Sequence, residues 1–200
     1  MGGKFKGYML RTCGADMTSR GGFRWPKRGQ VTVPDWNPTP VCGGGLHGLL
    51  WGRGSSGLLD WSDGAVWQVV GINKWVEIDG NKIKVPAGYV IYSGDRKGAT
   101  DAIIRLGADP SYVPGAFRTG GDRSTLTGGY ESTLTGGDRS TLTGGDWSTL
   151  TGGDWSTLTS GYWDGSRYRI ATAYPGENGI KINTPYRYNA KTNVWDEVTT

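Results

Sequence analysis

Between Gly120 and Thr159 nearly the same eight residues occur five times in succession, and this period restricts the fold more than any other feature of the sequence. Each octad reads Gly-Gly-x-x-Ser-Thr-Leu-Thr, and only its third and fourth residues vary. A short repeat of glycine, one apolar residue and β-branched threonine is typical of stacked β-coils, in which each coil packs only on its neighbours. The sequence therefore predicts a β-solenoid over this segment.

Side chains alternate along a strand, so the leucine and serine of each octad share one face and its two threonines share the other. Leucine must leave water, which places Leu and Ser inside and turns the Thr-x-Thr pairs outward. The expected inner leucines are Leu126, Leu134, Leu142, Leu150 and Leu158. The Gly-Gly pair predicts a tight bend, with one of its residues at positive φ.

One octad supplies one strand and one corner, so a closed coil needs two octads, and residues sixteen apart stack. This places Arg123, Arg139 and Trp155 in one corner column. The other corner column holds Trp147 and Trp163, one coil apart. Aspartates beside the first column are expected to accept hydrogen bonds from backbone N–H groups, since a bare acidic column would repel itself.

The octad is similar to the repeat of bacterial ice-nucleation proteins, whose sixteen-residue coils form a β-solenoid with outward Thr-x-Thr rows. The resemblance covers residues 120–163. It implies an ice-binding or structural solenoid as one function. The predicted Thr face is only about 14 Å long at about 4.8 Å per coil, so ice nucleation itself is not expected of so few coils.

A broader resemblance links nearly the whole chain to a group of uncharacterised phage and prophage proteins. It rests on the order of an N-terminal domain carrying Gly94-Asp95-Arg96-Lys97-Gly98, then octads, then Tyr162-Trp163-Asp164-Gly165. The resemblance implies a phage-type accessory protein in the host cytoplasm. Its implied partner is a host protein or ribonucleoprotein, such as a CRISPR effector of the host defence.

The N-terminal region reads as short strands with one helix. Asp95 caps the helix, and Gly107 ends it near residues 95–107. Asp79-Gly80 predicts a hairpin turn. The expected strands are residues 6–12, 30–33, 66–72, 75–79, 82–85 and 90–92.

The predicted fold class is mainly β: an α+β N-terminal domain, a short β-solenoid of sixteen-residue coils and a β-hairpin cap. The three parts are expected at residues 1–117, 118–163 and 164–200. The 36 glycines among 200 residues agree with many tight turns. Strands are expected in the cap at residues 162–173, 180–188 and 192–198, because an uncovered solenoid end would expose unpaired strand edges.

Candidate chemistry lies in the N-terminal domain. His47 follows Cys42 by five residues, which is compatible with a zinc site that includes Cys13, with a Cys-His nucleophile pair, or with a buried thiol and a loop histidine. The four-ligand spacing of zinc sites and the phosphate-loop motifs are absent. No cofactor is expected. An enzyme or small-molecule-binding alternative would use a pocket with His47, Arg53 and Asp16.

The net charge of +4 and the cluster of Arg24, Lys27 and Arg28 around Trp25 leave nucleic-acid binding open, because basic side chains hold phosphates and aromatic rings stack on bases. An exposed hairpin would carry the same residues. No apolar segment reaches the length of a membrane span, and the start has no apolar signal core, so a cytoplasmic protein with reduced Cys13 and Cys42 is expected.

The preferred hypothesis is a non-enzymatic protein that binds and inhibits a host protein through exposed aromatic and arginine side chains, the usual anchors of interfaces. A homodimer through the solenoid remains an alternative. The candidate partner-binding residues are Arg123, Arg139, Trp147, Trp155, Trp163, Arg24, Trp25, Lys27 and Arg28.

Overall fold

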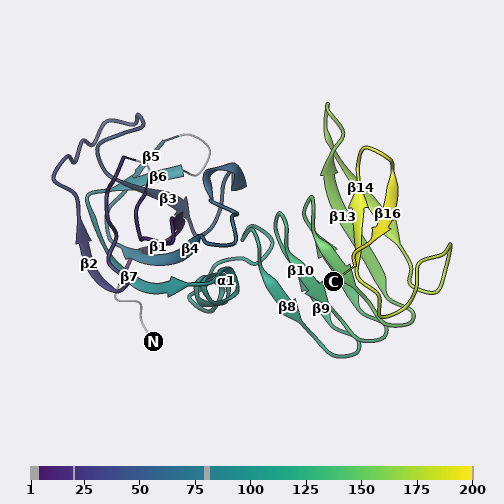
Figure 1. The fold of residues 1–200 in the computed structure, drawn as a ribbon. Coiled ribbons are helices and arrows are strands. Elements are labelled where there is room, and N and C mark those ends of the chain that lie inside the picture. Colours follow the sequence, from purple (N-terminus) through teal and green to yellow (C-terminus); the bar gives the residue numbers. More distant parts are fainter. Residues whose placement is uncertain (1–4, 20, 79–81, 200) are drawn as a thin grey trace. The chain divides into compact units, whose positions relative to one another are not determined.

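The computed structural model describes residues 5–19, 21–78 and 82–199, and the chain folds into two compact units, Met1–Asp109 and Pro110–Thr200 (Figure 1). Strands dominate both units, and three sheets hold all sixteen strands of the described residues. The mainly-β prediction is confirmed. The Asp79-Gly80 turn lies outside the described residues.

The first unit contains a seven-stranded sheet with the order β2-β7-β4-β1-β3-β6-β5. Its strands are β1 (Gly7–Cys13), β2 (Gly29–Thr32), β3 (Leu46–Leu50), β4 (Val66–Ile72), β5 (Val76–Glu77), β6 (Lys82–Val85) and β7 (Ala87–Gly94). Every pairing in this sheet is antiparallel. The predicted strands are present, but β5 covers only two of residues 75–79, and Asp79 lies outside the described residues. The strand β3 was not predicted. The sequence of β3 does not look like a strand because of its central Gly48, a glycine that makes room for the side chain of Met9 from β1.

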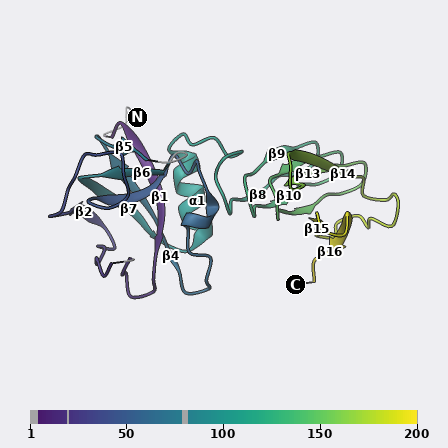
Figure 2. The ribbon, with the colours of Figure 1, turned by 90° about the horizontal axis from the view of Figure 1, so that it is seen from above.

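One α-helix, α1 (Arg96–Arg105), follows β7, and Figure 2 shows it lying against the sheet. The Asp95 carboxylate accepts a hydrogen bond from the Gly98 N–H at 2.6 Å, which confirms the predicted cap. Ala99, Thr100 and Ile103 form its buried face. Among the described residues of the first unit, a short 3-10 turn, η1 (Ser56–Leu58), is the other helical segment. Within the described ranges, no helix has both the length and the apolar character to cross a membrane.

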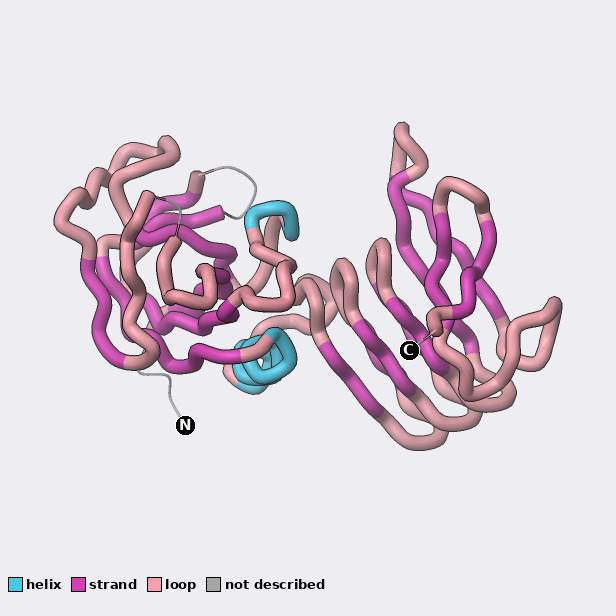
Figure 3. Tube along the Cα trace, viewed as in Figure 1, coloured by secondary structure: helices cyan, strands magenta, loops and turns pink. Residues whose placement is uncertain are grey.

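The second unit opens with the solenoid, whose coils follow one another in Figure 3. Successive strands of the solenoid belong in turn to two walls, and the strands within each wall are parallel. One wall holds β8 (Phe117–Thr119), β10 (Thr133–Thr135) and β12 (Thr149–Thr151). The other wall holds β9 (Thr125–Thr127), β11 (Thr141–Gly144) and β13 (Thr157–Trp163).

Strand register confirms the two-octad coil, because Leu134 pairs with Leu150 and Leu142 pairs with Leu158, sixteen residues later. All five repeat leucines are buried. Ser148 lies beside them, and its hydroxyl donates to the Gly129 carbonyl at 3.1 Å and accepts from the Ser132 N–H at 3.2 Å. The inner serines therefore link successive coils while leucine excludes water.

The glycines of the octads do not have positive φ, which corrects the prediction, and all of them except Gly121 serve close packing. The left-handed residue is the fourth of each octad, as in Arg139 with φ of 58°. At Gly136 an added Cβ would lie 2.7 Å from the Cβ of Ser140, and at Gly145 it would lie 2.8 Å from the backbone of Gly129. Only glycine leaves room for the inner serine and for the neighbouring coil.

The C-terminal cap continues both walls with antiparallel strands. The strand β14 (Tyr168–Ala173) pairs with β13. On the other wall β15 (Tyr186–Asn189) pairs with β12 and with β16 (Val194–Glu197). Residues 180–185, predicted as part of a strand, form turns and irregular backbone instead, and the Asn183 N–H donates to the Gly152 carbonyl of the last coil.

Candidate functional site

The wall of β9, β11 and β13 presents a regular outward face of threonines. Strand register places its members side by side in two rows, Thr125, Thr141 and Thr157 in one and Thr127, Thr143 and Thr159 in the other. Rows of this kind are spaced by about 4.8 Å between strands and about 6.6 Å along a strand. Within the part of the chain that the structure describes, none of these six hydroxyls makes a hydrogen bond to the protein.

The opposite wall is less regular. Phe117 pairs with Thr133 where a threonine would continue the row. The guanidinium of Arg187 donates to the Thr149 hydroxyl at 3.1 Å. On this wall only the row of Thr119, Thr135 and Thr151 is complete. The wall of β9, β11 and β13 is therefore the one with two complete threonine rows.

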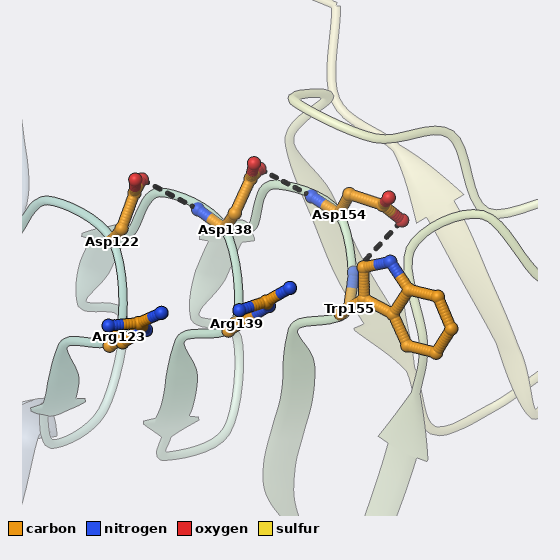
Figure 4. A pocket seen from close by; sticks show the side chains of 6 residues that line it. All are labelled: Asp122, Arg123, Asp138, Arg139, Asp154 and Trp155. Carbon is orange, nitrogen blue, oxygen red and sulfur yellow. Dashed lines mark hydrogen bonds between the residues drawn. The ribbon is translucent and has the colours of Figure 1, made fainter.

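The predicted corner column is present, and it forms a shallow groove of about 420 Å³ (Figure 4). Its acidic row confirms the expected hydrogen bonds: Asp122 accepts from the Asp138 N–H at 3.0 Å, and Asp138 accepts from the Asp154 N–H at 2.8 Å. The carboxylate of Asp154 closes the row by accepting from the Trp155 N–H at 3.0 Å. Asp122 and Asp138 thus each tie one coil to the next.

Arg123, Arg139 and Trp155 form the second row of this groove (Figure 4). Among the described residues neither guanidinium has a hydrogen-bond or ion-pair partner, and Trp155 is 78% exposed. All three residues have positive φ, a conformation that bulky side chains adopt at some cost. The groove thus presents two free cations and an aromatic ring to solvent.

The other corner departs from the predicted column. Trp147 is half exposed at positive φ, with the Arg187 guanidinium 5.9 Å from its ring centre. Trp163 is not a corner residue, because β13 continues to it and pairs it with Tyr168 of β14. Burial raises the pKa of Asp146, opposed by hydrogen bonds from the Trp147 and Trp163 N–H groups.

The basic cluster of the first unit is only partly a surface. Arg24, Lys27 and Arg28 are exposed. Trp25, in contrast, is 3% exposed in the core, and the Arg11 guanidinium lies 3.5 Å from its ring centre. Its ring cannot stack on a base, so the prediction of Trp25 as a binding residue was wrong. Trp25 was assigned from its basic neighbours in sequence, whereas Arg11 lies on a strand distant in sequence.

The structure does not gather the three pocket candidates. His47 lies half-buried on β3, where burial and the nearby Lys82 and Lys84 lower its pKa. Asp16 is exposed in a turn and accepts a hydrogen bond from the Thr18 N–H at 2.9 Å. Arg53 is exposed in the turn after β3. A hollow of about 280 Å³ in this unit is lined by other residues, among them Phe5, Lys74 and Tyr89.

Sequence reasoning missed the pairing of a thiol with a lysine. The Lys82 ammonium donates to the exposed Cys42 sulfur at 3.2 Å, and this hydrogen bond lowers the pKa of the thiol. The buried Lys84 donates to the Val41 and Gly43 carbonyls, both at 2.8 Å, and so holds the same loop. Cys13 is free and buried. No group of three or more metal-binding side chains occurs in residues 5–19, 21–78 and 82–199.

We expect Cys42 to react with an alkylating agent at lower pH than an ordinary cysteine, because the thiolate is the nucleophile and Lys82 favours it. The measurement is the alkylation rate against pH with the Cys13→Ser chain, which leaves one thiol. Lys82→Met should move the midpoint to higher pH. An unchanged midpoint in that variant would contradict the assigned cause.

Comparison with known proteins relates the repeats to one group. The chain is 36% identical over 112 residues to an ice nucleation protein of Pseudomonas syringae, a match that covers 54% of this chain and 9% of that protein. It is 35% identical over 104 residues to the ice nucleation protein InaU of Pantoea ananas, covering 50% of this chain and 10% of that protein. A similar protein of Xanthomonas campestris pv. translucens is 35% identical over 97 residues.

The chain therefore spans a tenth or less of the length of these relatives. No family model matches the chain, and no solved structure matches it significantly. The resemblance of the whole chain to phage proteins receives no support from these relatives. The chain is thus similar to ice nucleation proteins over about half of its length. Its repeats form coils with a sixteen-residue register and buried leucines.

Proposed function

We propose that the second unit binds ice through the outward threonine face of β9, β11 and β13. The observation that carries the proposal is the array of six threonines in register, whose hydroxyls are free of partners within the described chain. The names of the relatives, which are ice nucleation proteins, support the same proposal.

The chemistry of this face suits an ordered water layer. A threonine hydroxyl donates one hydrogen bond and accepts two. The methyl group of the same side chain adds an apolar surface beside the hydroxyl. Threonine is stiff at χ1, and the backbone beneath is held by parallel pairing and by the inner serines. Water on such a face is positioned by groups that are already fixed, so little protein entropy is lost on binding.

The size of the face limits the activity. Three strands with spacings of about 4.8 Å make a face about 10 Å wide, with two threonines on each strand. This area supports attachment to existing ice. It is too small to template a new crystal by itself.

Thr141→Tyr tests the proposal. Thr141 lies on the central strand, so a bulky ring there breaks the flat face, and we expect thermal hysteresis and capture of the labelled protein by growing ice to fall to background. Circular dichroism should stay unchanged because the side chain points to solvent. Thr192→Tyr, an exposed threonine in the same unit, should retain the wild-type activity.

Thr149→Tyr assigns the face, because Thr149 lies on the opposite wall and is engaged by Arg187. We expect this variant to keep ice capture. A wild-type chain without thermal hysteresis or ice capture would refute the proposal, and loss of activity only in Thr149→Tyr would place the site on the other wall.

A second candidate function is protein binding through the corner groove, favoured by the two unpaired guanidiniums and the 78% exposed Trp155. The relatives lend no support to the hypothesis of a host-defence inhibitor. A protein from a bacterial lysate that binds the wild-type chain, but not Trp155→Ala or Arg139→Ala, would support this candidate. Equal capture by all three chains would contradict it.

A further inference from the structure

The cap strand β14 forms an open sheet edge. In the sheet order β14-β13-β11-β9, β14 is the last strand, and only one of its sides is paired. Among the backbone hydrogen bonds of the described residues, none fills the other side of Tyr168–Ala173. Such an edge is a template for another strand.

The outward face at this edge is apolar. Tyr168 is 78% exposed and Ile170 is 73% exposed. Cross-strand pairing places Thr172 beside Thr159 and Tyr168 beside Trp163, where the two rings pack edge to face with centres 5.3 Å apart. The face of Tyr168, Ile170 and Thr172 is therefore a direct continuation of the threonine face.

A charged side chain opposes strand addition at the β16 edge of the other sheet, whereas the outward face of β14 has no such charge. On the other wall the edge strand β16 carries Asp196 and Glu197, both exposed, and Glu197 forms an ion pair with Lys181 at 2.8 Å. Asp196 therefore supplies the charge that opposes pairing of two copies of that edge. The charged side chain of β14, Arg169, lies on the face opposite to Tyr168 and forms an ion pair with Asp164 at 2.6 Å. The outward face of β14 thus carries no charge.

We propose that two copies of this chain pair through β14, in antiparallel register, about a two-fold axis that passes between their Ile170 residues. Identical strands related by a two-fold axis normal to the sheet run antiparallel. In this register Ile170 faces Ile170 of the other copy, and Tyr168 faces its Thr172. Aliphatic pairs and pairs of an aromatic with a β-branched residue are favourable across antiparallel strands. The edge is self-complementary, and we therefore infer that the strand that pairs with it is β14 of a second copy of this chain.

The pairing joins two four-stranded sheets into one. Because the axis is normal to the sheet, both threonine faces lie on the same side of the joined sheet. The pairing itself does not depend on the proposed function; only its consequence, a longer ice-binding face, rests on that function.

Sedimentation of the full chain tests the pairing. We expect a monomer–dimer equilibrium with a dissociation constant in the micromolar range, because one edge pairing buries less surface than a standard interface. Ile170→Lys places two like charges opposite each other and removes two apolar side chains, so it should weaken the dimer about tenfold or more. Leu58→Lys is the matched control, because Leu58 is an exposed aliphatic residue of the first unit.

Cross-linking tests the register without relying on a disruptive variant. In a Cys42→Ser background, Ile170→Cys should form a disulfide-linked dimer on mild oxidation, since directly opposite residues in an antiparallel pair lie about 4.5–5.5 Å apart. Leu58→Cys in the same background should remain monomeric under the same conditions.

A wild-type chain that stays monomeric at high concentration would overturn the proposal. A dimer that survives Ile170→Lys, or fails to cross-link through Ile170→Cys, would overturn the assignment to β14. The proposed function fails separately: Thr141→Tyr should lose ice capture and keep the dimer, whereas Ile170→Lys should lose the dimer and bind ice more weakly than the wild type.

Discussion

Leu142→Asp is expected to prevent folding of the repeat unit. Leu142 is fully buried in the central coil, where its strand pairs on both sides with β9 and β13. A carboxylate there would lie within a ladder of leucine side chains, with no cation to pair it. The cost is several kcal/mol, a large part of the about 5–15 kcal/mol that stabilises an ordinary domain.

The measurement is hydrogen exchange of the amides in the two walls, which should lose their protection in Leu142→Asp. The first unit has its own sheet and core, so its amides should remain protected. Thr143→Asp is the control, because it adds the same charge one residue later on the exposed face. Equal loss of protection in both variants would contradict an inward leucine ladder.

Gly137→Ala is expected to lower the free energy of unfolding of the repeat unit by about 1–3 kcal/mol, the usual cost of overpacking. An added Cβ would meet the Asp122 carboxylate and lie 2.8 Å from the Asp122 backbone nitrogen. The carboxylate would have to move, which breaks its hydrogen bond to the Asp138 N–H. The neighbouring backbone has little room to move, because parallel pairing holds the coils.

Gly121→Ala is the matched control for this variant. Gly121 has the same place in its octad and the same corner, yet an added Cβ there meets nothing within 4 Å. Denaturant unfolding of the two variants should show a loss of stability in Gly137→Ala and little change in Gly121→Ala. Similar losses in both would indicate that backbone entropy, and not contact between coils, selects glycine.

Local sequence patterns were enough to predict the position of a residue wherever its neighbours in space are set by the repeat. Alternation within Ser-Thr-Leu-Thr placed Leu142 inside and Thr141 outside, and the sixteen-residue period placed Asp122 against the Asp138 N–H. The Asp95 cap was equally readable, because it depends on a residue only three positions away.

The sites that depended on distant contacts were not readable. Trp25 looks like an exposed aromatic among cations, but Arg11 of β1 covers its ring in the core. Lys82 reaches Cys42 across forty residues. Gly48 conceals a strand, because its lack of a side chain is explained only by Met9 on the neighbouring strand.

By itself the sequence determined the solenoid, its coil length and the two faces of each strand. In a repeat, the same contacts recur in every coil, so they can be worked out from one repeat unit. Only the tertiary structure decided which wall keeps two complete threonine rows, since Arg187 and Phe117 come from outside the octads. It also decided that β14 ends as an open, apolar edge. Both outcomes depend on how the cap strands return to the coils, and no period in the sequence encodes that return.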